Sequence, residues 1–93
     1  MAALLVNDVR SAVKAFVLAE FLSGEDPNEL TDEVELMTLG ILDSVGVLKL
    51  VAFLEERFSV TLAPHEVGKG HLNTLRSIAG LVVAKRSSAH ESA

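Results

Sequence analysis

The sequence predicts an all-α domain: a four-helix bundle with a short third helix and a long first loop. Apolar residues recur at three- and four-residue spacing in three segments, as they do along one face of a helix. Only residues 59–62, short and β-branched, read as extended. The chain has 93 residues, of which 49% are hydrophobic, and this is enough for one small core. We therefore expect a single domain over residues 1–86, followed by a flexible polar tail over residues 87–93.

The first predicted helix has one apolar stripe and ends at Ser23-Gly24. The stripe consists of Leu5, Val9, Val13, Phe16, Val17 and Phe21. Gly24 can adopt the left-handed conformation that ends helices, and Pro27 follows where a helix could not continue. Residues 24–43 then form a long acidic connection, which a domain this small has to anchor or use. The expected anchors are Leu30, Leu36, Leu39 and Ile41.

The second predicted helix begins at Asp43 or Ser44 and reaches Phe58. Its core-facing stripe has amphipathic spacing and comprises Val47, Leu50, Val51, Leu54 and Phe58. A neighbouring apolar strip beside Ser44 stays partly exposed, and it comprises Val45, Leu48 and Ala52. Glu55 and Glu56 lie nearer the far end, on the more solvated side. Because Ser44 stands at a helix N-terminus, its hydroxyl is exposed and suited to carry an anionic group.

The sequence pattern in the last part of the chain predicts a brief helical turn and a longer final helix. The turn covers residues 64–67 and opens with proline, and Gly68 and Gly70 then break the chain. Thr74 is a good N-cap for the final helix, whose apolar residues are Leu75, Ile78, Ala79, Leu81, Val82 and Val83. The bundle is expected to form from three stripes, with the long loop lying across them. These are Val9/Val13/Phe16, Leu50/Leu54/Phe58 and Leu75/Ile78/Val82.

Composition excludes several classes of function. The net charge of −5 argues against nucleic-acid binding, which needs a basic patch. The absence of cysteine excludes disulfides and thiolate metal sites, and the spacing of His65, His71 and His90 does not fit ligands, so no metal is expected. Charged and polar residues interrupt the apolar N-terminal stretch. It is therefore neither a signal peptide nor a membrane span, and we expect a cytoplasmic protein.

Three short motifs together fit a single sequence signature. They are Gly40-Ile41-Leu42-Asp43-Ser44, then Leu50-Val51 with Phe53-Leu54-Glu55-Glu56-Arg57-Phe58, and finally Leu72-Asn73-Thr74-Leu75. Together they resemble the signature of acyl carrier proteins and their peptidyl-carrier relatives, over about residues 16–83. The resemblance implies that Ser44 receives 4′-phosphopantetheine from coenzyme A, and that Asp43 supports this modification. The thiol of that arm would hold an acyl or aminoacyl group as a thioester, which suits a chain without cysteine.

The resemblance also implies the partners. These are a phosphopantetheinyl transferase with magnesium, an acyl- or aminoacyl-activating ligase, and acyltransferases. The carrier itself would be a free-standing monomer and not an enzyme, with no catalytic residues of its own. The expected partner-facing residues are Val45, Gly46, Leu48, Lys49, Ala52, Glu55 and Glu56.

Two departures from the family pattern bear on the pathway. Carriers of fatty acid biosynthesis usually have acidic residues where this chain has Gly46 and Lys49. A lysine there repels partner arginines, and like-charge contacts are a common way to reject wrong partners. The pattern around Ser44 has some similarity to D-alanyl carrier proteins and other specialised carriers, as in secondary metabolism. A housekeeping fatty-acid carrier is the alternative within the family.

Other readings stay open beside the carrier. Asp-Ser before an apolar run is by itself an ordinary helix cap, so the chain could be an unmodified helical protein-interaction domain. A hydrolase nucleophile is a weak rival, because Leu42 stands where the first glycine of a G-x-S-x-G elbow belongs. The cargo is also open: a deep apolar cavity would favour a long acyl chain, and a filled core a small or polar one. The acidic first loop is either a solvated loop or a docking surface for basic enzymes.

Overall fold

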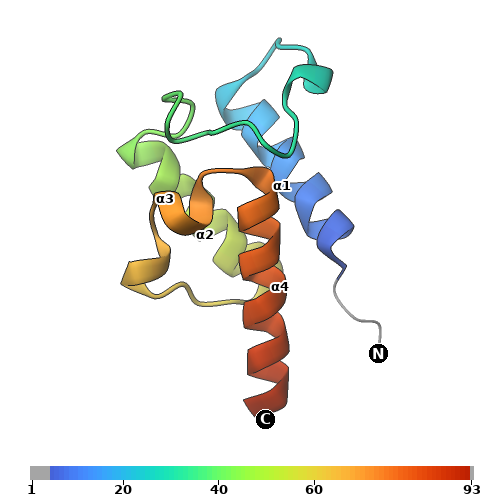
Figure 1. Cartoon of the computed structure of the whole chain (residues 1–93), viewed down its shortest axis with the longest axis vertical. Coiled ribbons are helices and arrows are strands. Elements are labelled where there is room, and N and C mark those ends of the chain that lie inside the picture. Colours follow the sequence, from blue (N-terminus) through green and yellow to red (C-terminus); the bar gives the residue numbers. More distant parts are fainter. Residues whose placement is uncertain (1–4, 93) are drawn as a thin grey trace.

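The computed structural model describes residues 5–92 of the chain, with side chains described through residue 86, and every regular element among them is helical (Figure 1). The elements in chain order are α1 (Val6–Phe21), the 3₁₀ turn η1 (Pro27–Glu29), α2 (Ser44–Phe58), the 3₁₀ turn η2 (Pro64–Glu66), α3 (Lys69–Leu72) and α4 (Leu75–Ser92). Three long helices and one short one form the bundle, so the predicted fold class is confirmed.

The three long helices bury the predicted stripes against one another. In Figure 1, α1 and α4 lie side by side in opposite directions, and α2 packs against both. The side chains that meet in the middle are almost fully buried, and they include Val9, Val13, Leu50, Leu54, Leu75, Ile78 and Val82. Other members of the predicted α1 stripe are less buried: Leu5, just before the helix, is 58% exposed, and Phe16 and Phe21 are half-buried.

The long first loop is anchored, but not by all of the expected residues. Leu30 and Leu36 are buried, as predicted, and Ile41 is half-buried. Leu39 is 67% exposed, so its prediction as an anchor is wrong, and Leu42 is buried instead. The difference arises from a tight turn between them: Gly40 has a positive φ of 79°, and the Leu42 N–H donates to the Leu36 carbonyl at 3.0 Å.

The short third helix lies one turn later than predicted. The predicted turn at residues 64–67 is the 3₁₀ turn η2, and α3 follows it with Gly70 inside the helix rather than ending it. The Leu72 N–H donates to the Gly68 carbonyl at 2.8 Å, and the Leu72 side chain is fully buried. Burial of this leucine outweighs the low helix propensity of glycine.

The final helix has the predicted cap but extends further than expected. The Thr74 hydroxyl accepts a hydrogen bond from the Ser77 N–H at 3.1 Å, which confirms Thr74 as a capping residue. Helix α4 then continues to Ser92, so the backbone of residues 87–92 is helical where a frayed tail was predicted. Because no glycine or proline follows Gly80, nothing in the sequence stops the helix earlier. Ala93 lies outside the described residues.

Candidate functional site

Ser44 is the first residue of α2, and it is exposed. The preceding residue caps the helix: the Asp43 Oδ1 accepts a hydrogen bond from the Gly46 N–H at 2.7 Å, and the Asp43 carbonyl accepts one from the Val47 N–H at 2.8 Å. The predicted helix start is therefore confirmed. The positive end of the α2 dipole lies at Ser44, so a negative group attached to its hydroxyl would be stabilised there.

Gly46 is buried beneath the end of α1, which corrects its prediction as a partner-facing residue. A Cβ at this position would lie 3.1 Å from a ring carbon of Phe21 and 3.2 Å from the Asp43 Oδ1. The absence of a side chain thus lets Phe21 pack over the first turn of α2. This contact fixes the start of α2, and with it Ser44, against the last residue of α1.

Exposed apolar side chains lie close to Ser44 in the chain. Val45 is 61% exposed and Leu48 is 67% exposed, and Ala52 is also exposed on the next turns of α2. The predicted exposure of this strip is confirmed. Leu39, on the turn that leads into Asp43, adds another exposed leucine that sequence reasoning assigned to the core. No local pattern marked it, because its exposure depends on how the loop folds back.

The charged residues on α2 differ in how strongly the rest of the protein holds their side chains. The Glu55 Oε2 accepts a hydrogen bond from the Leu62 N–H at 2.9 Å, so this half-buried carboxylate holds the extended segment after α2. Glu55 is therefore less solvated than predicted. Lys49 Nζ lies 4.0 Å from Glu20 Oε1, and both side chains are more than two-fifths exposed, so this ion pair is weak. Glu56 is exposed.

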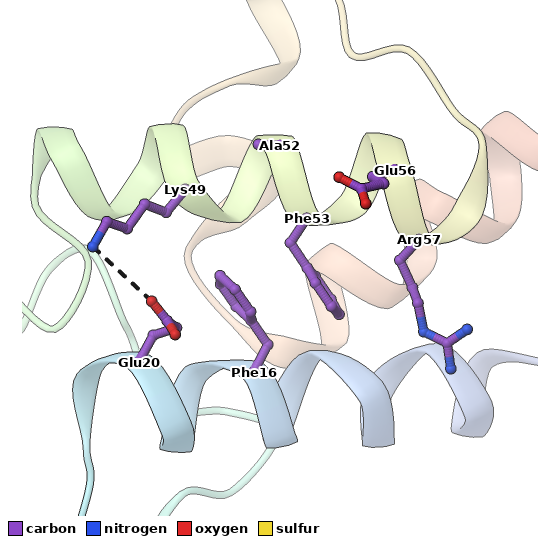
Figure 2. A pocket seen from close by; sticks show the side chains of 7 residues that line it. All are labelled: Phe16, Glu20, Lys49, Ala52, Phe53, Glu56 and Arg57. Carbon is purple, nitrogen blue, oxygen red and sulfur yellow. Dashed lines mark ion pairs between the residues drawn. The ribbon is translucent and has the colours of Figure 1, made fainter.

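A cleft of about 720 Å³ runs between α1 and α2 (Figure 2). Its lining residues are Phe16, Glu20, Lys49, Ala52, Phe53, Glu56 and Arg57. The rings of Phe16 and Phe53 stack at its centre, with centroids 4.3 Å apart and planes inclined by 15°. The Lys49–Glu20 pair lies toward one end of the cleft in this view, and Glu56 and Arg57 toward the other. The cleft is therefore apolar at its centre and charged at both ends.

Two of the three histidines lie near each other. The rings of His65 and His71 approach with centroids 6.4 Å apart, while the His90 side chain lies outside those described. Within the described residues, no three histidine, cysteine, aspartate or glutamate side chains gather into a group that could hold a metal ion. Nor does any helix within residues 5–92 combine the length and apolar character needed to span a membrane.

Comparison with known proteins identifies the class. Residues 17–82 match the family model described as a phosphopantetheine attachment site. A D-alanyl carrier protein of Streptococcus suis (strain 98HAH33) is 36% identical over 76 residues, which cover 82% of this chain and 92% of that protein. One from Streptococcus mutans is 34% identical over 71 residues, covering 76% and 86%. A solved structure titled "Structure of KstB-PCP(apo)" matches with a TM-score of 0.64 and 30% identity, covering 86% of this chain and 88% of that one.

The chain therefore belongs to the phosphopantetheine-attachment family of carrier proteins. The resemblance seen in its sequence motifs is confirmed. The cofactor of this family is 4′-phosphopantetheine, attached covalently. An exposed hydroxyl at the N-terminus of a 15-residue helix fits such a group, because its phosphodiester would lie at the positive end of the helix dipole.

Proposed function

We propose that Ser44 carries the 4′-phosphopantetheine arm, and that the protein presents an acyl or aminoacyl group on it to partner enzymes. The observation that supports this most directly is the exposed Ser44 hydroxyl at the start of α2, within the residues that match the family. When bound, the arm supplies a terminal thiol that holds the cargo as a thioester, and this chain has no thiol of its own.

The residues around the attachment point have separate roles in this proposal. In this proposal the Ser44 Oγ would form a bond to the phosphorus of the pantetheine phosphate as the pyrophosphate bond of coenzyme A breaks, with adenosine 3′,5′-bisphosphate as the leaving group and the hydroxyl proton passing to solvent. The α2 N-terminus then stabilises the phosphodiester charge. Asp43 serves twice, since one carboxylate oxygen caps α2 through Gly46 while the carboxylate as a whole supports the magnesium-dependent transferase.

Carrier proteins of this family work with phosphopantetheinyl transferases and with ligases or acyltransferases. We propose that such partners contact the exposed strip Val45, Leu48 and Ala52, with Lys49 and Glu56 at its edge. Gly46 is buried against Phe21, and the Glu55 carboxylate is bonded to the Leu62 N–H, so the proposed contact surface does not include them. The chain presents its cargo and performs no catalysis itself.

The proposed cargo is an amino acid or another small acyl group of a specialised pathway. Two D-alanyl carrier proteins among the relatives support this, and so does Lys49, which is exposed where fatty-acid carriers usually have an acid. A lysine on the docking surface disfavours enzymes that dock through arginines.

The test is to incubate the protein with coenzyme A, magnesium and a broad-specificity transferase, and to measure its intact mass. We expect the added mass of one phosphopantetheine group on the wild type and none on Ser44→Ala, whose circular dichroism should be unchanged because the residue is exposed. A wild-type protein that gains no mass would favour an unmodified interaction domain that uses the strip beside Ser44. Charging the modified protein with D-alanine or with fatty acids by the matching ligases then distinguishes the cargo.

A further inference from the structure

Asn73 links the long first loop to the junction of α3 and α4. Its backbone carbonyl accepts a hydrogen bond from the Leu36 N–H at 2.6 Å. Its side-chain Oδ1 accepts two more, from the Met37 N–H at 2.8 Å and the Thr38 N–H at 3.2 Å. Its Nδ2 donates to the Thr38 Oγ1 at 3.1 Å. One half-buried asparagine therefore makes four hydrogen bonds to three consecutive loop residues, more than 30 residues away in the chain.

The bonded segment leads directly to the attachment serine. Residues 36–42 form a closed turn, because the Leu42 N–H donates back to the Leu36 carbonyl and both leucines are buried. The turn holds Leu39 out toward solvent and ends at Asp43, which caps α2. Figure 1 shows this part of the loop lying just before the start of α2. Asn73 thus fixes the approach to Ser44 from outside the motif that contains it.

We propose that Asn73 is a positioning residue for the modification of Ser44, an inference that rests on the proposed function. It holds residues 36–42 in one conformation before the transferase binds. Without the side-chain bonds, the transferase would have to order this turn on binding, and ordering flexible residues weakens association. The loss should therefore raise the KM for the carrier and leave kcat nearly unchanged, since the Ser44 hydroxyl and the α2 cap are intact.

The experiment compares the wild type with Asn73→Ala, Asn73→Asp and Asn28→Ala. Asn73→Ala removes three side-chain bonds and keeps the backbone bond to Leu36. Asn73→Asp keeps an acceptor for the Met37 and Thr38 N–H groups. Asn28 is the matched control, because it is an exposed asparagine of the same loop whose only described hydrogen bond is made by its backbone N–H. Loading rates are measured by intact mass at several carrier concentrations, at a temperature where circular dichroism shows every variant folded.

We expect a KM about tenfold higher for Asn73→Ala, and values near that of the wild type for Asn73→Asp and Asn28→Ala. The Met37 and Thr38 amides should exchange faster in Asn73→Ala, while amides of α2 keep their protection. If Asn73→Ala does not fold, Thr38→Val replaces it: it removes one bond, and a KM about twofold to threefold higher is expected.

Equal KM values for the wild type and Asn73→Ala would overturn the inference and leave the proposed function standing. The same holds if Asn73→Ala has a lower melting temperature but the folded variant is loaded as the wild type is. A wild type that takes up no phosphopantetheine would overturn both. In that case the exchange data would still report whether Asn73 orders the loop.

Discussion

The Asp43 Oδ1 accepts a hydrogen bond from the Gly46 N–H at 2.7 Å, one residue on either side of the Ser44-Val45 pair. Asp43 thus stabilises α2 and stands beside the proposed attachment point. Replacing it by alanine should lower the free energy of unfolding by about 0.5–2 kcal/mol, as at other N-caps. Asp43→Asn should cost less, because the amide oxygen can accept the same bond.

The rate at which phosphopantetheine is attached distinguishes the two roles of Asp43. If its carboxylate supports the magnesium-dependent transfer, Asp43→Asn loads slowly although its urea midpoint stays close to that of the wild type. Intact mass over time and urea denaturation measure the two effects. If Asp43→Asn were loaded at the wild-type rate, Asp43 would act only as a helix cap.

Leu54 and Leu48 occupy the same helix with opposite environments, since Leu54 is fully buried and Leu48 is 67% exposed. Leu54→Ala removes packed methyl groups and leaves a cavity, so the free energy of unfolding should fall by about 2–5 kcal/mol. Leu48→Ala is the matched control and should change it by less than about 0.5 kcal/mol. Chemical denaturation of both variants tests this, and a costly Leu48→Ala would contradict the placement of the strip.

Reversing the charge of Lys49 should alter association rather than stability. The Lys49–Glu20 pair is long and solvated, so Lys49→Glu should change the free energy of unfolding by no more than about 1 kcal/mol. Loading by an enzyme that docks through arginines should become several-fold faster at low salt, with the difference shrinking as salt rises. Lys49→Gln should fall between the two. A loading rate that depends neither on the charge at position 49 nor on salt would contradict the placement of Lys49 on the docking surface.

Glu66 joins η2 to α4. Its Oε1 accepts hydrogen bonds from Lys85 Nζ at 2.7 Å and from the Ala63 N–H at 2.8 Å. The bond from Lys85, and then that from Ala63, lower the pKa of Glu66 below its ordinary value of 4.5. A lowered folded-state pKa means that the stabilisation is present above the unfolded pKa and is lost as pH falls through the folded one.

Glu66→Gln should therefore have a lower urea midpoint than the wild type at pH 7. The gap should close as the pH falls below about 4.5. Glu29→Gln, at an exposed loop position, is the control and should track the wild type at every pH. A gap that stays constant down to acidic pH would show that the charge of Glu66 does not contribute.

Local patterns in the sequence are enough to predict the three long helices and the proposed attachment serine. The stripes at Val9 and Val13, and at Leu50 and Leu54, repeat within four residues, which is the distance over which a helix makes its own hydrogen bonds. The cap and the site are equally local, because Asp43 reaches only to Gly46. The family motif around Ser44 adds the chemistry.

Tertiary contacts decided what the surface around that point looks like. Leu39 is exposed and Leu42 buried because the loop closes on itself and is bonded to Asn73. Gly46 is buried because Phe21, from the end of another helix, packs over it. Residues that meet across more than 20 positions of chain leave no periodic trace in the sequence. By itself, then, the sequence determined that this protein is a helical carrier with a serine at a helix start. Only the packing of distant segments decided which side chains surround that serine, because burial depends on neighbours that no local spacing encodes.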